Sequence, residues 1–158
     1  MRILGIDPGT GILGFGVIEI DAKNKAHLVD GGVIRTPAKE DDAVRLMTIY
    51  EELTDIITKT KPNIMSVEKL FFAQNVTTAM TVAQARGVVL LAGQQNGLEL
   101  YEYTPLQIKQ ALTGYGRADK KQMQEMVRVI LGLKEVPKPD DCADALAAAI
   151  CHSMSSRL

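Results

Sequence analysis

Hydrophobic and polar positions alternate along the chain in two distinct patterns. Short apolar runs bounded by turn residues are typical of strands, whereas apolar residues three and four positions apart are typical of helices. The predicted strands are 2–7, 13–20, 27–35, 63–68 and 98–103. The predicted helices are 42–60, 76–96, one that begins at Thr104-Pro105, 118–133, and 140 to about 154. Short links join the first three strands, which predicts an antiparallel meander. The fourth strand follows a helix, so a crossover would place it parallel to the first.

This order of elements predicts an α/β fold with a mixed five-stranded sheet flanked by helices. A chain of 158 residues suits one compact domain, expected over 1–158, and 46% hydrophobic residues are enough to form a core. Gly14 and Gly16 lie on the same face of the second predicted strand. Glycines in that arrangement often mark the close approach of another backbone.

The helix predicted at 76–96 is unusual because it has almost no polar face. Its apolar positions are Val76, Ala79, Met80, Val82, Ala83, Ala85, Val88, Val89, Leu90, Leu91 and Ala92. A helix that is apolar all round is normally buried all round. Either a partner subunit or the remainder of the same chain could cover its second side, and both interpretations stay open.

The chain shows no sign of export. We find no stretch long enough and free enough of charge to span a membrane, and Asp7 interrupts the N-terminal apolar run. Cys142 and Cys151, if on one helix, would be about 13 Å apart, too far for a disulfide. His27 and His152 are isolated and are expected to be surface or core residues. A cytoplasmic, reducing location is expected.

The net charge of −1 gives no overall signature of a nucleic-acid-binding protein, but the charges are unevenly distributed. Acidic residues dominate 40–57. Basic residues dominate 109–128, where they are Lys109, Arg117, Lys120, Lys121 and Arg128. Local patches decide what a surface attracts, although two solvated helix faces of opposite sign would give the same pattern.

Four carboxylates fall at the ends of predicted elements. Asp7 ends the first strand, Glu68 ends the fourth, and Asp141 and Asp144 lie three residues apart at the start of the last helix. Each could merely begin a turn, close a strand or cap a helix. Together they would repel one another unless a divalent cation were present, and carboxylate oxygens favour Mg²⁺ or Mn²⁺. Two such ions support phosphodiester hydrolysis by a metal-activated water.

Four segments extend this interpretation to a known family. GIDPGTGILGFGV, the strand end Glu68-Lys69-Leu70-Phe71, AQARGVV and PKPDDCADALAAAI resemble the RuvC family of Holliday junction resolvases across nearly the whole chain. The resemblance implies a ribonuclease H-like fold and a homodimer that works with the RuvAB branch-migration complex in DNA recombination and repair. It also implies symmetric, Mg²⁺-dependent nicking of four-way junction DNA in two strands of like polarity, with two ions per subunit.

The resemblance also assigns residue roles. The four acids of the family fall on Asp7, Glu68, Asp141 and Asp144, as both catalytic residues and metal ligands, and Asp140 is an additional acid. The DNA-stacking aromatic falls on Phe71, with Phe72 beside it. The functional lysines fall on Lys109 and Lys120. Arg117 and Lys121 are further candidate DNA contacts in the same basic segment.

Three alternatives remain open at this point. The GID-x-GT hairpin is similar to the phosphate loop of actin-like and Hsp70-like ATPases, but those need two such domains to enclose a nucleotide. A ribonuclease H acting on RNA–DNA hybrid shares the core topology, yet the apolar helix at 76–96 favours a dimer. A junction-binding module without activity would have no need of all four acids.

Overall fold

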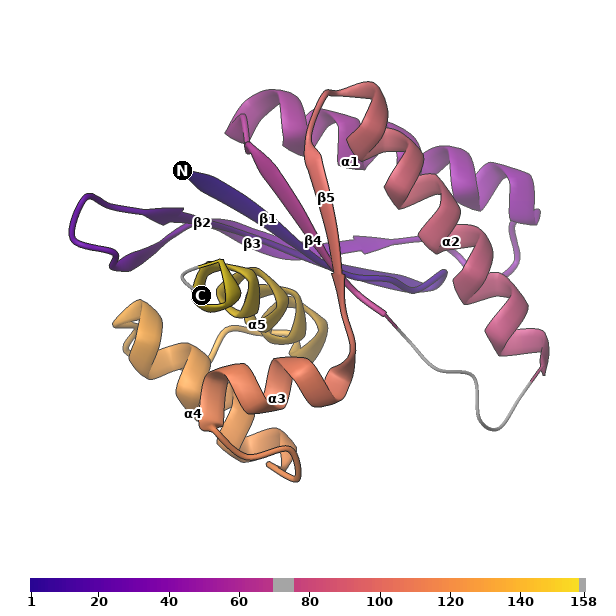
Figure 1. The fold of residues 1–158 in the computed structure, drawn as a ribbon. Coiled ribbons are helices and arrows are strands. Elements are labelled where there is room, and N and C mark those ends of the chain that lie inside the picture. Colours follow the sequence, from indigo (N-terminus) through magenta and orange to yellow (C-terminus); the bar gives the residue numbers. More distant parts are fainter. Residues whose placement is uncertain (70–75, 157–158) are drawn as a thin grey trace.

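The computed structural model in Figure 1 describes residues 1–69 and 76–156. Its strands are β1 (Arg2–Asp7), β2 (Ile12–Ile20), β3 (Ala26–Arg35), β4 (Ile64–Glu68) and β5 (Glu99–Tyr103). Its helices are α1 (Asp42–Thr60), α2 (Val76–Gln95), α3 (Pro105–Thr113), α4 (Lys120–Leu131) and α5 (Asp140–Ser155). The predicted elements are therefore confirmed, with boundaries that differ by one or two residues.

The five strands form one mixed sheet in the order β3-β2-β1-β4-β5. β1 pairs antiparallel with β2, and β2 pairs antiparallel with β3. β4 lies parallel to β1 on one side and to β5 on the other. The predicted meander and crossover are both confirmed, and this topology with helices on both faces is the ribonuclease H-like fold.

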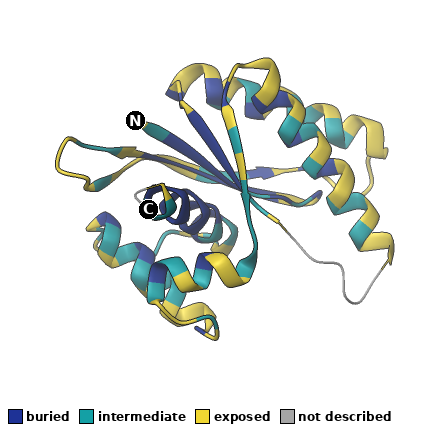
Figure 2. Cartoon of the chain, viewed as in Figure 1, coloured by how far each residue is buried: buried dark blue, intermediate teal, exposed yellow. Residues whose placement is uncertain are grey.

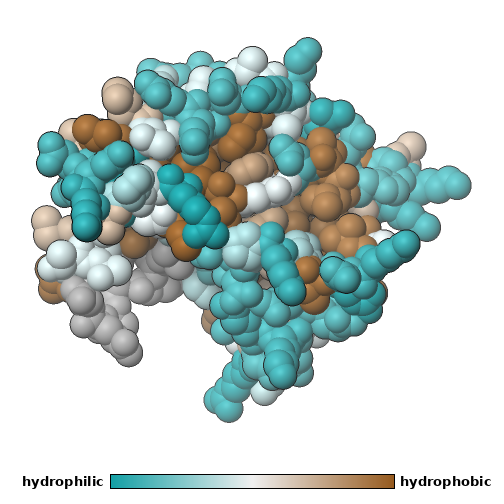
Figure 3. Space-filling view, turned by 180° about the vertical axis from the view of Figure 1, so that it is seen from behind, coloured by the Kyte–Doolittle hydropathy of each residue, from teal (hydrophilic) through white to brown (hydrophobic). Residues whose placement is uncertain are grey.

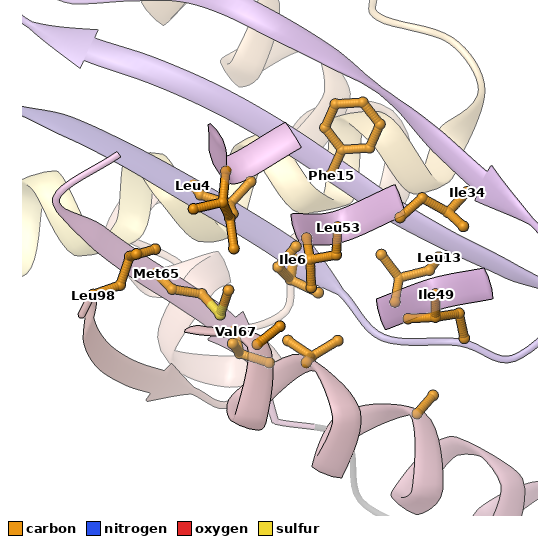
Figure 4. Close-up of a cluster of buried hydrophobic side chains, with 14 of the residues drawn as sticks. Leu4, Ile6, Leu13, Phe15, Ile34, Ile49, Leu53, Met65, Val67 and Leu98 are labelled. Carbon is orange, nitrogen blue, oxygen red and sulfur yellow. The ribbon is translucent and has the colours of Figure 1, made fainter. Parts of the chain in front are cut away.

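Helices cover the two faces of the sheet in separate groups. α1 and α2 lie on one side of the sheet, and α3, α4 and α5 lie on the other (Figure 1). Each interface has its own buried cluster of aliphatic side chains. Figure 4 shows the cluster on the α1 and α2 side, where Leu4, Ile6 and Val67 from the sheet meet Ile49 and Leu53 from α1.

α5 is almost completely buried and packs unusually close to the sheet (Figure 2). A Cβ atom on Gly5 would lie 1.9 Å from the carbonyl oxygen of Ala145, and one on Gly14 would lie 2.0 Å from that of Asp141. A Cβ on Gly16 would overlap the Leu146 side chain. The close backbone approach predicted from the glycines of the second strand is confirmed, and the approaching backbone is that of α5.

Capping residues fix the starts of the two short helices. The Thr104 side chain accepts a hydrogen bond from the Gln107 backbone at α3, and Asp119 accepts one from Gln122 at α4. In each capping box the glutamine side chain accepts a bond from the backbone of the cap residue in return. α4 therefore begins after Asp119 rather than at residue 118.

The structure bears on one of the two interpretations of α2. Only Ala85, Val89, Ala92 and Gly93 are buried, against α1, β4 and β5, while the large side chains Val76, Met80 and Leu91 are exposed. The described part of the same chain therefore does not cover the second side of α2, and cover by a partner subunit stays a prediction. Periodicity could not reveal this, because both faces of the helix are apolar.

α2 also corrects the expectation that no stretch could cross a membrane. Among the described residues it is the one helix that is long and apolar enough by length and composition. Arg86, at its middle, donates from Nε to Glu102 Oε2 of β5 at 2.8 Å, a contact that fastens the helix to the sheet. Length and composition alone are weak evidence for a membrane span.

Exposed apolar side chains occur away from α2 as well. Seen from behind the view of Figure 1, hydrophobic side chains interrupt the hydrophilic surface in several places (Figure 3). Leu28 and Val29 of β3 are among the exposed apolar residues, as are Leu106, Tyr115 and Val129 on the α3 and α4 side. Cys142 and Cys151 are both buried, and both are free, as expected.

Candidate active site

Asp7 and Glu68 lie side by side at the carboxyl ends of β1 and β4. The two strands are parallel neighbours, and Ile6 pairs with Val67 in the register, so the next residue of each strand is an acid. The two carboxyl groups are close enough to share a hydrogen bond. The expectation that both acids lie at one edge of the sheet is confirmed by this arrangement.

α5 brings the other two acids to the same edge. Gly14 is the register partner of Asp7, and the backbone of Asp141 rests directly on Gly14. The Ser66 hydroxyl of β4 donates to the Ala148 carbonyl at 2.7 Å, which fastens the next turns of the helix. Asp144 then lies one turn after Asp141, near Glu68.

The electrostatics of this group are those of carboxylates that lack a sufficient counter-charge. Burial and the neighbouring Glu68 raise the pKa of Asp7 to about 9. Burial likewise raises the pKa of Glu68 and of Asp144, although Lys109 opposes the first shift and Lys120 opposes the second. A buried carboxyl either holds its proton or meets a cation, because an isolated buried charge is costly.

The side chains do not stand in a finished coordination shell. Within residues 1–69 and 76–156, no three or more His, Cys, Asp or Glu side chains are arranged closely enough to hold a metal ion. The nearest approach to such a site is the Asp7–Glu68 pair with Asp141 and Asp144 beside it. The donor atoms are all carboxylate oxygens, which fit a hard divalent cation such as Mg²⁺.

A pocket of about 200 Å³ opens next to Glu68 and Asp144. Its other walls come from three helices, and they include Pro105 at the start of α3 and Lys120 at the start of α4. Helix N-termini carry partial positive charge and attract phosphate groups. The pocket therefore combines carboxylates with two sources of positive potential, the helix ends and the lysines Lys109 and Lys120.

Asp140 is not directed to the other four acids. Its Oδ2 lies 2.8 Å from Lys120 Nζ, and its Oδ1 accepts a hydrogen bond from Gln124 Nε2 at 3.1 Å. Lys120 lowers the pKa of Asp140, which is the opposite of the shift at Asp144. Sequence reasoning found Asp140 as an additional acid but not these partners, because they depend on how α4 packs against α5.

The candidate DNA contacts fall in different places. Lys109 and Lys120 line the pocket. Lys121 lines a separate groove of about 460 Å³ together with Tyr115 and Met126, and Arg117 is exposed on the link between α3 and α4. Phe71 and Phe72 lie outside the described residues, so their predicted role stays a prediction.

Three residues missed by sequence reasoning secure the turn after Asp7. The Thr36 hydroxyl donates to the Thr10 carbonyl in the β1–β2 turn and accepts from Arg45 Nε at 3.1 Å. These bonds tie the turn to the end of β3 and to the first turns of α1. No sequence signal identifies them, since Thr36 and Arg45 lie in ordinary loop and helix positions. His27 and His152, as expected, are an exposed and a buried residue, paired with Asp21 and Tyr103.

Comparison with known proteins identifies one protein family over nearly the whole chain. Residues 3–152 match the family model for crossover junction endodeoxyribonuclease RuvC. A protein of that name from Desulfitobacterium hafniense (strain DSM 10664 / DCB-2) is 58% identical over 158 residues, which are all of this chain and 95% of the relative.

Two solved structures of Thermus thermophilus RuvC are also similar. One has a TM-score of 0.93 and 40% identity, and covers 99% of this chain and 96% of its own. The other, RuvC in complex with Holliday junction substrate, has a TM-score of 0.91 and 38% identity over the same shares. The chain described here belongs to the RuvC family of crossover junction endodeoxyribonucleases.

Proposed function

We propose that this protein resolves four-way DNA junctions by metal-dependent hydrolysis of one phosphodiester bond in each of two strands of like polarity. The observation that carries the proposal is the meeting of Asp7, Glu68, Asp141 and Asp144 at one edge of the sheet, beside a pocket that also holds two lysines. The RuvC structure with a bound Holliday junction supports the same substrate class. Residues 1–158 would act as a single nuclease domain.

The four carboxylates would be the metal ligands. Mg²⁺ bound there, in two copies per subunit, would activate a water and stabilise the charge on the leaving oxygen, and Mn²⁺ is a plausible substitute. Asp7 and Glu68 are partly buried, so their charge has little solvent to stabilise it and favours a bound cation. Membership of the family and the all-oxygen donor set support this assignment.

The chain would position the scissile phosphate through its positive groups. Lys109 and Lys120 flank the pocket, and the N-termini of α3 and α4 face it. Phosphate contacts fix the register of DNA without reading its sequence. Arg117 and Lys121 would extend the contact along the backbone, and Phe71, with Phe72 next to it, would stack on an unpaired base near the centre of the junction.

Two cuts in one junction require two sites, and α2 supplies a surface on which a dimer could form. Val76, Met80 and Leu91 expose large apolar side chains on one helix, although a helix this apolar is usually covered. We therefore propose a homodimer through α2. We also propose the RuvAB branch-migration complex as a partner, on family resemblance, and a cytoplasmic, reducing location, on the two free cysteines.

One experiment separates this function from its alternatives. The purified protein is incubated in Mg²⁺ with a four-way junction, a linear duplex of the same sequence and an RNA–DNA hybrid, and the nicks are mapped. Paired nicks at symmetric positions in the junction alone are expected. Cutting of the hybrid would favour a ribonuclease H activity, and tight junction binding without nicks would favour a binding module.

A further inference from the structure

An ion pair joins the first turns of α4 and α5 at the mouth of the pocket. Lys120 Nζ lies 2.8 Å from Asp140 Oδ2, and Gln124 Nε2 donates to the other carboxylate oxygen at 3.1 Å. Both side chains of the pair are more than half exposed. Asp140 therefore faces solvent next to the site, with its two oxygens occupied by α4.

The backbone beneath Lys120 is fixed, but its side chain is not. Lys120 is the first residue of α4, directly after the Asp119 capping box. Its four-carbon side chain has many rotamers, and the ammonium can bind partners in several directions. In the described part of the chain, Asp140 is the one acid in ion-pair contact with this ammonium, while Asp141 and Asp144 act on it from farther away.

We propose that Asp140 is a positioning residue for Lys120. It holds the lysine ammonium at the mouth of the pocket through one of the three N–H donors, and it keeps this contact while a DNA phosphate binds the other two. This inference rests on the proposed nuclease function. It concerns only how Lys120 is presented to DNA, because Asp140 itself touches neither the four acids' cation nor the reacting atoms.

The chemistry of the pair suits both roles of Asp140. Exposed ion pairs are weak, because water and salt screen them and two side chains lose freedom on pairing. A phosphate carries the same charge type as Asp140 and binds lysine by the same hydrogen bonds. The carboxylate therefore reduces the positive charge that Lys120 offers to DNA and repels nearby phosphates, while its hydrogen bond keeps the ammonium in one orientation.

Charge reduction and positioning by Asp140 predict opposite effects of its removal on junction binding and on junction cleavage. Asp140→Asn keeps the shape of the side chain and an oxygen that can accept from Gln124, but it removes the charge. Binding should become tighter, because Lys120 is free and one repulsive charge is gone. Cleavage of the bound junction should become slower, because the lysine is no longer held in place.

A purely structural role would give a different pattern. An acid in the first turn of α5 also interacts favourably with the helix dipole. If that were its only contribution, Asp140→Asn would lower thermal stability, and weaker binding would accompany slower cleavage. Tighter binding together with slower cleavage cannot come from a destabilised helix.

The test measures binding and single-turnover cleavage separately. Binding to a four-way junction is measured without divalent metal over a range of salt concentrations, and cleavage is measured in Mg²⁺ with enzyme in excess. For Asp140→Asn we expect affinity to rise about three- to tenfold at low salt, and the slope of log K against log salt to steepen by about one. The cleavage rate of the bound junction should fall by about fivefold or more.

Two further variants identify the route of the effect. In a Lys120→Ala background, Asp140→Asn should leave the cleavage rate unchanged, because the residue that it positions is absent. Glu19→Gln is the matched control, since it removes one acid from an exposed pair with Arg2, at the end of β1 opposite Asp7. It should alter neither the salt slope nor the rate.

The outcomes distinguish this inference from the proposed function. A wild-type protein that neither binds nor nicks junctions would overturn both. An active wild type whose Asp140→Asn variant binds with an unchanged salt slope, or binds more weakly, would overturn the inference alone. So would an Asp140→Asn effect on the cleavage rate that persists in full after Lys120→Ala.

Discussion

Gly14 of β2 lies directly beneath Asp141 of α5, so close that a Cβ on Gly14 would stand 2.0 Å from the Asp141 carbonyl oxygen. Gly14 is also the register partner of Asp7. The absence of one side chain therefore sets the distance between a strand-borne acid and a helix-borne acid of the candidate active site. Packing and site geometry depend on the same backbone contact.

We expect Gly14→Ala to damage both the packing of α5 on the sheet and the geometry of the candidate active site. The added methyl group would push the first turn of α5 away from the sheet, at a cost of about 3 kcal/mol in the free energy of unfolding. Thermal unfolding should show a fall in Tm of roughly 10 °C, and junction cleavage should fall more than junction binding. Gly11→Ala is the control, because its Cβ would meet only the Arg45 guanidinium at 3.5 Å. Equal effects of the two substitutions would contradict this account.

Neutralising one acid of the candidate active site should abolish junction cleavage and leave junction binding intact. Asp7→Asn, Glu68→Gln and Asp144→Asn each remove one proposed metal ligand and one charge that repels phosphate. Cleavage in Mg²⁺ should drop roughly a thousandfold, equivalent to about 4 kcal/mol, whereas the Kd for a junction should stay level or improve. Gel-shift and cleavage assays on the same samples make the comparison. Near-wild-type cleavage by any of the three would remove that residue from the site.

The raised pKa of Asp7 predicts how stability depends on pH without metal. A carboxyl with a pKa of about 9 in the folded protein and near 4 in the unfolded chain binds its proton more tightly when folded. Its contribution is therefore complete below about pH 4 and is lost as the pH rises toward 9. Glu68 and Asp144, whose pKa values are also raised, act in the same direction.

Thermal unfolding in EDTA between pH 5 and 9 tests this dependence. The Tm of the wild-type protein should fall across the range, and Asp7→Asn should flatten the curve and exceed the wild type at pH 8 by roughly 5 °C. Mg²⁺ should restore the wild-type Tm at pH 8, since it binds the ionised carboxylates, but should help Asp7→Asn much less. Parallel curves for the two proteins would count against an elevated pKa at Asp7.

The proposed dimer can be tested on the exposed face of α2. Leu91→Glu places a charge where we expect a partner subunit, so it should convert a particle of about twice 17.2 kDa into a monomer. Sedimentation at micromolar concentration gives the mass. Val129→Glu on α4, at a similarly exposed position, should leave the mass unchanged. The monomeric variant should also lose paired nicking, and a monomeric wild type that still makes paired nicks would contradict the proposal.

The role assigned to Phe71 is tested by comparing it with Phe72. Stacking on an unpaired base contributes about 1–3 kcal/mol, so Phe71→Ala should slow junction cleavage by roughly ten- to hundredfold. Thermal stability should change little. Phe72→Ala is the comparison, and a larger loss of cleavage there would transfer the role to the neighbouring ring. A marked fall in Tm for Phe71→Ala would instead assign that residue to the core.

Local chemistry made most of the fold predictable. Turn residues separate the strands, Pro62 follows α1, and Asn96-Gly97 ends α2, so the element order could be read directly. The crossover predicted parallel pairing of β1 with β4, and this pairing places Asp7 and Glu68 at one edge of the sheet. These features depend on neighbours in the sequence or on a general rule of chain handedness.

The remaining features depend on packing between distant segments. The partner of Asp140 is set by the angle between α4 and α5, which no periodicity encodes. The exposed face of α2 could not be recognised, because the pattern is apolar on every side. The distances among the four acids follow from the contact between α5 and the glycines of β2. The sequence indicated that another backbone approaches these glycines, but it did not indicate that this backbone belongs to α5.

The dependence of the site on α5 has a consequence for protein synthesis. Residues 140–155 supply Asp141 and Asp144 and cover one face of β1 and β2, and the Ser66–Ala148 hydrogen bond spans 82 residues of chain. A nascent chain that has emerged only as far as α4 has Asp7 and Glu68 but neither of their helix-borne partners. With the four acids as the proposed metal ligands, the nuclease would be inactive while this region is still being translated. Activity would begin only when α5 docks, so folding itself would delay DNA cutting until Asp141 and Asp144 have reached the sheet.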